Sequence, residues 1–140
     1  MIRGLMLVAL ACLPVVAGCG SNQTLPSTTV QPTSQTSHHG LFIVSYTPDL
    51  GHVPLNRMQS WTLHVETAGG EAIGHAKITV SGGMPDMGHG LPTAPTTSYL
   101  GNGTYSVRGL EFTMPGRWLV TFTIAAAGQS DRTTFNLQLQ

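Results

Sequence analysis

The chain has 140 residues, of which 41% are hydrophobic and only 9% charged, and six Lys and Arg residues balance six Asp and Glu residues. This length suffices for one domain, and the lack of any basic patch or run argues against binding to nucleic-acid phosphates. The two cysteines, Cys12 and Cys19, lie near the N-terminus. The rest of the chain therefore has no thiol for a disulfide, a cysteine-based zinc site or a blue-copper centre.

The first residues have the pattern of a secretory signal. A short basic start at Arg3 precedes an apolar run from Leu5 to Val16, which is too short to indicate a membrane span. The sequence VAGC, which ends at Cys19, resembles a bacterial lipobox, in which the signal is cut before a cysteine that then carries lipid. We therefore expect residues 1–18 to be a lipoprotein signal peptide and Cys19 to be the lipid anchor. The alternative is a plain signal peptide with an incidental cysteine.

The next segment is rich in Ser, Thr, Gln and Pro and has almost no apolar side chains over residues 20–37. Such a composition cannot bury enough apolar surface to offset the entropy lost on ordering. We expect residues 19–39 to be a flexible tether between the lipid and a folded domain. That domain would cover residues 40–140, which is the size of one small sandwich domain.

The expected domain has an apolar period of two, which predicts β-strands. In the stretch WTLHVET, apolar Trp61, Leu63 and Val65 alternate with polar residues. No amphipathic helix of useful length is present. Further alternating stretches cover residues 77–80, 117–124 and 133–140, and a less polar run starts at Leu41.

A hairpin is predicted where GNG, Gly101 to Gly103, separates two short apolar stretches at Tyr99 and Tyr105. Six or seven short strands with turn signals between them predict an all-β fold, an immunoglobulin-like antiparallel β-sandwich. The chain lacks the Cys…Trp…Cys pattern, so a true immunoglobulin domain is not implied.

The stretch GGMPDMGHG, residues 82–90, is unusual because a segment of Gly and Pro that predicts a turn also holds two methionines and a histidine. The hairpin at GNG folds the chain back on itself, so we expect residues 111–118, EFTMPGRW, to lie beside this turn. Four donor side chains would then meet at one end of the sandwich: Met84, Met87, His89 and Met114.

Three thioethers and one imidazole without a thiolate form a ligand set that suits copper, above all Cu(I). Zinc prefers more nitrogen, thiolate or carboxylate ligands, and calcium and magnesium prefer oxygen. Methionine also fills irregular gaps, so the alternative is that these residues only pack the end of the sandwich. Sulfur atoms that converge on one accessible point would favour a site, whereas scattered and buried sulfurs would favour packing.

The remaining histidines are weaker candidates for metal binding. His38 and His39 are adjacent at the start of the expected domain and could bind Cu(II) or Zn(II). If the tether folds back, these two could also hold Cu(II) together with His89. The other three histidines are expected to be surface residues: His52, His64 and His75.

Catalysis finds little support in the sequence. The six acidic residues have no spacing that pairs two of them, and neither a phosphate-binding loop nor a nucleophile elbow occurs. Asp86 near His89 could form a base and its orienting partner, but no Ser or Cys nucleophile accompanies them. We therefore expect no enzymatic activity.

Residues 41–139 resemble the YtkA-like domain family, which is related to FixH-like proteins of bacterial envelopes. The resemblance follows an order of features: an AKITV strand that leads into a Met-Pro-x-Met turn, a Gly-x-Tyr hairpin, a Met-Pro-Gly-x-Trp corner and a terminal hairpin. The later block is the more specific one, because five residues keep their order and spacing: Tyr105, Met114, Pro115, Gly116 and Trp118.

The resemblance implies a small β-sandwich on the outer side of the membrane, linked in several settings to copper handling or to the assembly of copper-containing respiratory enzymes. The family's Met-Pro-x-Met-x-His turn falls here on Met84, Pro85, Met87 and His89, and its corner falls on residues 114–118. FixH-like members keep a membrane helix, whereas this chain has a cleavable lipoprotein signal pattern, which argues against a direct role in oxidase assembly.

The sequence thus predicts an extracytoplasmic, membrane-anchored copper-binding domain. It would act as a carrier, buffer or sensor that exchanges copper with another envelope protein. The alternative is a non-metal β-sandwich module of the cell envelope, whose methionine-rich end is an apolar patch for a partner protein or part of the core.

Overall fold

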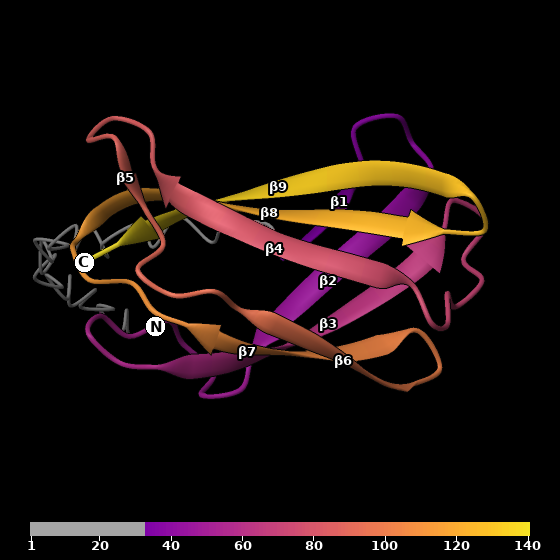
Figure 1. Ribbon diagram of the computed structural model, residues 1–140, viewed down its shortest axis with the longest axis horizontal. Coiled ribbons are helices and arrows are strands. Elements are labelled where there is room, and N and C mark those ends of the chain that lie inside the picture. Colours follow the sequence, from indigo (N-terminus) through magenta and orange to yellow (C-terminus); the bar gives the residue numbers. More distant parts are fainter. Residues whose placement is uncertain (1–32) are drawn as a thin grey trace, which may run out of the picture.

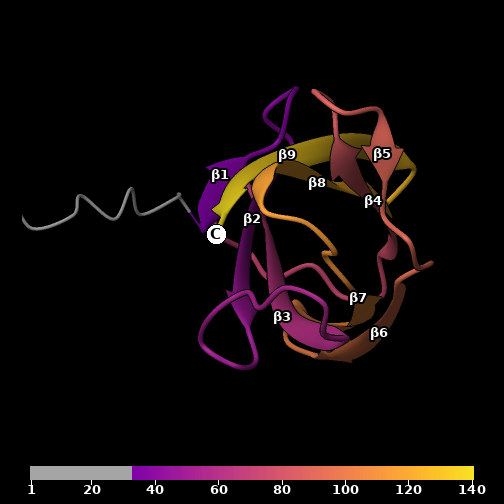
Figure 2. The same ribbon diagram turned by 90° about the vertical axis from the view of Figure 1, so that its left-hand side faces the viewer.

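The computed structural model describes residues 33–140, which form two antiparallel β-sheets that face each other (Figures 1 and 2). One sheet has the strand order β1-β2-β3-β7-β6 and the other has the order β5-β4-β8-β9. No helix in this part of the chain is long and apolar enough to cross a membrane. The long strands are β2 (Phe42–Pro48), β3 (Gln59–Thr67), β4 (Lys77–Met84), β6 (Thr96–Gly101), β7 (Thr104–Leu110), β8 (Gly116–Ala126) and β9 (Gln129–Leu139); the short ones are β1 (Ser34–Thr36) and β5 (His89–Gly90).

The seven long strands have the arrangement of an immunoglobulin constant-type sandwich. In chain order they correspond to strands A to G, and the two sheets then read ABED (β2-β3-β7-β6) and CFG (β4-β8-β9). The prediction of an immunoglobulin-like sandwich of six or seven strands is confirmed. The two additional strands, β1 and β5, are edge strands of only three and two residues.

The alternation seen in the sequence determines which side chains enter the core. On β3, Trp61, Leu63 and Val65 are fully buried, as their spacing predicts. Strand β8 contributes a second buried row that starts at Trp118, and β9 contributes a third that ends at Leu139. The two rows are aligned because β8 and β9 pair without interruption from Gly116 to Ala126. This pairing of β8 with β9 is the longest in the smaller sheet.

The hairpin predicted at GNG joins β6 to β7 and places Tyr99 opposite Tyr105. Its three residues all have positive φ, with values of 112° at Gly101, 45° at Asn102 and 69° at Gly103. A Cβ atom on Gly103 would also lie 2.7 Å from the carbonyl oxygen of Val65, so glycine is needed there for space as well as for conformation.

The domain begins earlier than predicted, because part of the expected tether is a strand. Residues 34–36 form β1, which pairs with β2, and the backbone N–H of His38 donates to the carbonyl of Arg132 on β9 at 2.8 Å. Strand β1 thereby connects the two sheets at one edge of the sandwich (Figure 2). An edge strand needs only main-chain donors and acceptors, so its polar composition did not reveal it. The predicted signal peptide, Cys19 and residues 20–32 of the expected tether lie outside the described residues.

Tyr105 fixes the connection between β3 and β4. Its ring is buried, and its hydroxyl group donates to the carbonyl of Ile73 at 2.7 Å and accepts from the N–H of Ala76 at 3.0 Å. Burial raises the pKa of this hydroxyl group above its usual value, so the group stays protonated and remains a donor. One side chain therefore satisfies two backbone groups of a segment that has little regular structure of its own.

Replacing Tyr105 by Phe should lower the free energy of unfolding by about 1–3 kcal/mol, because both backbone groups lose their partner. Urea denaturation followed by tryptophan fluorescence measures this change. Tyr99→Phe is the matched control, since its ring packs 5.1 Å from that of Tyr105 and would be retained. An equal loss in the two variants would contradict the role assigned to the Tyr105 hydroxyl.

Candidate metal-binding sites

Three connections between strands gather at one end of the sandwich, which faces the viewer in Figure 2: β2–β3, β4–β5 and β7–β8. Every methionine among the described residues lies on or beside one of them. Met58 is the one that the sequence analysis did not single out. It immediately precedes β3, and β3 pairs with β7, the strand that leads into the Met114 corner. A prediction of this pairing would have placed Met58 at the same end as Met114. The methionines at this end are Met58, Met84, Met87 and Met114.

The turn between β4 and β5 is built by proline and glycine. Met84 and His89 are paired across these two strands, so their side chains lie on the same face of the ribbon. Between them, the N–H of Met87 donates to the carbonyl of Met84 at 3.1 Å, with Pro85 at the second turn position. Gly88, with a φ of 67°, completes the loop. The backbone of this turn thus needs neither methionine side chain.

The corner before β8 packs directly against this turn, as the hairpin predicted. The indole N–H of Trp118 donates to the carbonyl of Met114 at 2.9 Å and closes the corner. Gly116 has a φ of 125°, and a Cβ atom at this position would lie 2.8 Å from the terminal methyl carbon (Cε) of Met84. The Met84 side chain therefore rests against the backbone of the corner, and Gly116 is needed for both conformation and space.

Asp86, at the tip of the turn, is held by Arg117 at the start of β8. The guanidinium donates twice to the carboxylate, from Nε to Oδ2 at 2.9 Å and from Nη2 to Oδ1 at 2.7 Å. The hydrogen bonds from Arg117 lower the pKa of Asp86 below its usual value. The pair is exposed, so it orients the turn more than it stabilises the fold. Asp86 is thus engaged by Arg117, and the considered arrangement of Asp86 with His89 does not form.

The four predicted donors differ in their exposure. Met84 belongs to the core, with 3% of its surface exposed, and Met114 is half-buried against the core. Met87 is 56% exposed and His89 is also exposed. Met84 and His89 both line a shallow hollow beside the turn. The structure thus brings the turn and the corner together but does not place all four side chains in one environment.

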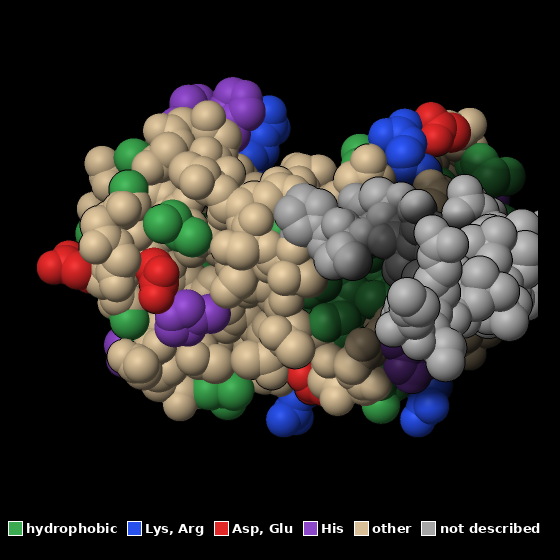
Figure 3. Space-filling model, turned by 180° about the vertical axis from the view of Figure 1, so that it is seen from behind, with side chains coloured by type: hydrophobic (Ala, Val, Ile, Leu, Met, Phe, Trp, Pro, Cys, Tyr) green, Lys and Arg blue, Asp and Glu red, His purple; other side chains and the backbone are tan. Residues whose placement is uncertain are grey.

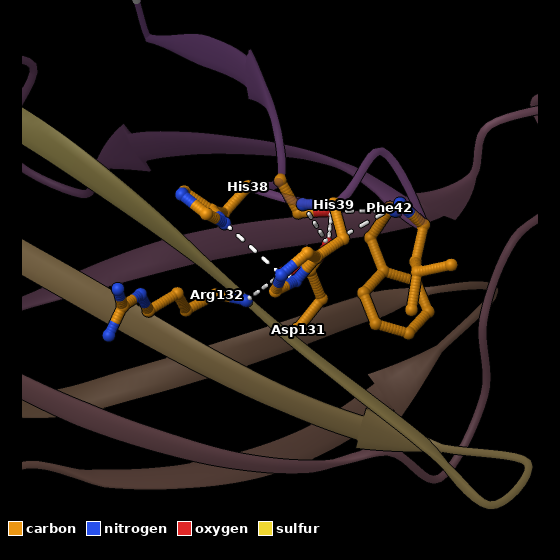
Figure 4. Close-up of polar contacts among 7 residues, drawn as sticks. His38, His39, Phe42, Asp131 and Arg132 are labelled. Atoms are coloured by element: carbon orange, nitrogen blue, oxygen red, sulfur yellow. Dashed lines mark hydrogen bonds and ion pairs between the residues drawn. The ribbon is translucent and has the colours of Figure 1, made fainter.

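The two weaker candidates lie elsewhere, on the turn between β1 and β2. Figure 3 shows histidine side chains that project from the surface where this turn lies. Nδ1 of His38 is 3.4 Å from Nε2 of His39, and Nδ1 of His39 is 3.0 Å from Oδ1 of Asp131 on β9 (Figure 4). One donor atom from each of these three residues lies within 4.8 Å of the others. The sequence analysis missed Asp131, although it occupies an inward position in the alternation of β9.

Asp131 is a buried carboxylate that accepts several hydrogen bonds. Its side chain has no exposed surface, and it accepts hydrogen bonds from the hydroxyl of Ser37 at 2.6 Å and from the backbone N–H groups of His39 and Arg132 at 2.8 Å each. Burial alone would raise the pKa of Asp131, but these hydrogen bonds outweigh it and hold the pKa well below the usual range. Asp131 is therefore ionised and acts only as an acceptor.

His38 and His39 cannot share an ion with His89, so the third possibility raised from the sequence is wrong. Strands β5 and β9 are the opposite edges of a four-stranded sheet, about 14 Å apart. The strand register also places Asn136 of β9 in the same row across the sheet as Gly90 of β5. Asp131 lies five residues from Asn136 along β9, which adds a separation of about 17 Å along the strand. The register of the sheet separates the two sets of ligands.

The remaining histidines lie at the surface of the sandwich. His64 is half-buried on the outer side of β3, where its ring nitrogens lie 3.2 Å from the hydroxyl of Thr104 and 3.1 Å from the carboxylate of Glu66. His52 and His75 are exposed, as expected. None of the three lies in the clusters described above.

Comparison with known proteins agrees with this fold. A family model described as YtkA-like matches residues 45–123. No protein of curated function matches the sequence. Among solved structures, a DUF4426 family protein from Pseudomonas aeruginosa PAO1 is similar, with a TM-score of 0.53 and 15% identity over 76% of this chain and 94% of that chain. At this identity the similarity concerns the fold alone.

A second solved structure, the ZirS C-terminal domain, has a TM-score of 0.39 and 16% identity, over 96% of this chain and 88% of that chain. This similarity is too low to support an argument about either fold or function.

Replacing Gly116 by Ala should lower the free energy of unfolding by about 1–3 kcal/mol, because the φ at this position is strained for any residue with a Cβ atom. Urea denaturation measures the change. Adding Met84→Leu, which shortens the side chain at the contact, should recover only the part of the loss that comes from the clash. Full recovery in the double variant would contradict a backbone requirement at Gly116.

Asp131 should make folding stability depend on pH in acid. Its pKa is lower in the folded state, so its contribution is complete above the ordinary carboxyl pKa of about 4 and is lost as the pH falls from there towards the folded-state pKa. Urea midpoints between pH 6 and pH 2.5 should fall in the parent chain and fall less steeply in Asp131→Asn. The matched control is Asp86→Asn at the exposed pair, which should alter the acid dependence less.

Proposed function

Because the chain belongs to the YtkA-like family, we propose that it is an extracytoplasmic, lipid-anchored domain that binds copper through methionine and histidine side chains and takes part in copper handling or delivery. The observation that carries this proposal is the placement of Met87 and His89, both exposed, on a turn that packs against the corner holding the half-buried Met114. Copper is the cargo in this proposal, and the domain is a binding module with no reaction of its own.

The donor set supports Cu(I) as the form of the cargo. Thioether sulfur and imidazole nitrogen are soft and borderline ligands, and no thiolate exists among residues 20–140 to hold the ion more strongly. Met87 and His89 are the donors that an ion reaches from solvent, and Met114 adds a third. Met84 is buried against Gly116, so its environment suits packing better than ligation.

Rigid support of the turn is a further argument for binding. The Asp86–Arg117 pair ties the tip of the turn to β8, and the Trp118 hydrogen bond to Met114 fixes the neighbouring corner. Donors whose positions are fixed before the ion arrives lose less conformational entropy on binding. This support reaches both sequence segments that carry the donors.

The proposed membrane anchor is the lipid on Cys19. The 14 residues between Cys19 and Ser34 can span at most about 50 Å. A domain on such a tether would stay close to the membrane surface and could meet copper-donating or copper-accepting proteins of the envelope.

A second candidate function is a non-metal interaction module. Three large apolar side chains at the same end of the sandwich are exposed: Leu50 at 41%, Met58 at 58% and Met87 at 56%. Apolar residues grouped at one end of a small domain suit contact with a partner protein. Under this alternative the methionines contribute apolar area, and their sulfur atoms have no separate role.

The double substitution Met87→Leu and Met114→Leu separates the two functions, because it conserves apolar volume and removes sulfur. We expect it to abolish Cu(I) binding while the free energy of unfolding changes by less than about 1.5 kcal/mol. An anaerobic Cu(I) titration of the chain against a chromophoric chelator measures the affinity, and urea denaturation measures the stability.

Met58→Leu is the matched control, since Met58 is an exposed methionine at the same end but lies next to β3 of the other sheet. It should leave Cu(I) affinity unchanged. An unchanged affinity in the double variant, or an equal loss in the control, would contradict the assignment and favour the interaction module.

A further inference from the structure

The turn between β1 and β2 holds two imidazole nitrogens at a distance that suits joint ligation of a metal ion. Nδ1 of His38 and Nε2 of His39 are 3.4 Å apart, and the two rings are nearly perpendicular, at 81°. Both side chains are exposed, so an ion can reach them from solvent. These residues lie away from the proposed copper turn, and metal binding here does not depend on copper binding there.

The distance between the two nitrogens indicates the coordination geometry. Zinc lies about 2.0–2.1 Å from histidine nitrogen in tetrahedral sites, so two such ligands are about 3.3–3.4 Å apart. Two neighbouring ligands of a square-planar ion at similar bond lengths would be only about 2.9 Å apart. The observed 3.4 Å thus matches the ligand separation of a tetrahedral ion.

Asp131 prepares His39 to be a ligand. The carboxylate accepts hydrogen bonds from the Ser37 hydroxyl and from two backbone N–H groups, and its contact with Nδ1 of His39 at 3.0 Å fits an imidazole proton on Nδ1. The lone pair of Nε2 is then directed away from Asp131 and towards His38. A carboxylate that accepts from the far nitrogen of a ligand histidine is the usual outer partner of zinc sites, where it fixes the ring and raises its basicity.

The backbone around the pair is also fixed. The Ser37 hydroxyl, which donates to Asp131, accepts from the N–H of Phe42 at 2.9 Å, and the N–H of Gly40 donates to the carbonyl of Ser37 at 2.9 Å. Gly40 has a φ of 78°, which closes the turn. A buried carboxylate on β9 therefore holds the turn in place, unlike a pair of histidines on a free chain.

We propose that His38 and His39, with Asp131 behind His39, form a binding site for a divalent metal ion of the zinc type. Nδ1 of His38 and Nε2 of His39 are the two protein ligands, and water or a side chain of a partner protein fills the other positions. Arg132 is the nearest cation along β9, and its guanidinium extends away from both imidazoles in Figure 4. The site differs from the methionine turn in position and in ligand softness, so the two ends of the domain would select different ions.

The test uses the full chain, purified in detergent and freed of metal, with Zn(II) alone as the probe. Isothermal titration calorimetry should show one bound equivalent, and the side-chain nitrogen resonances of His38 and His39 should shift in the NMR spectrum. His38→Ala and His39→Ala should each weaken binding at least about tenfold, and Asp131→Asn should weaken it by about 10- to 100-fold. His52→Ala, at another exposed histidine, is the matched control and should change nothing.

A synthetic peptide of residues 36–41 tests whether the fold matters, because it contains both histidines without Asp131. It should bind Zn(II) at least about tenfold more weakly than the chain. Equal affinity of peptide and chain, or binding that survives the double substitution of His38 and His39, would overturn the proposal. Circular dichroism of each variant checks that a loss of binding is not a loss of fold. If Asp131→Asn fails to fold, the two histidine variants and the peptide still decide the outcome.

Discussion

The packing of aromatic rings around Trp61 is the interaction on which the rest of this sandwich depends. Residues 20–140 contain no cysteine, so no disulfide can join the two sheets. Instead Trp61 stacks on Tyr46, with ring centroids 4.4 Å apart, and reaches Phe122 on the opposite sheet at 6.4 Å. Its indole N–H, which burial would otherwise leave unpaired, donates to the side chain of Gln59 at 3.1 Å. The sheets are thus held by burial of large apolar area and not by a covalent link.

The candidate copper turn lies at the rim of this aromatic cluster. Phe112 stacks near Trp61 at 5.9 Å and meets Trp118 edge-on at 5.2 Å, and Trp118 in turn holds the carbonyl of Met114. The core thereby continues into the corner, and the corner supports the side chain of Met84. The turn that carries the exposed Met87 and His89 is consequently supported by the core, although the turn itself has little regular structure.

The histidine turn near the other end of β9 is held by a different kind of interaction. There a single buried carboxylate, Asp131, collects hydrogen bonds from the chain between β1 and β2. A buried charge without such partners would be costly, so each donor around Asp131 is needed for the fold as well as for the turn. Apolar packing supports the methionine turn at one end of the sandwich. The buried carboxylate of Asp131 supports the turn that carries His38 and His39.

The fold class follows from the sequence alone, because a period of two in apolar residues such as Trp61, Leu63 and Val65 depends only on the alternation of side chains along a strand. The sequence also predicts the GNG hairpin and, through the hairpin, the meeting of the Met84 turn with the Met114 corner. The exposure of each methionine, the edge strand β1 and the partner of His39 emerge only in the folded molecule. These depend on contacts between residues far apart in the chain, such as Asp131 with His39 and Gly116 with Met84, and local composition carries no record of such contacts.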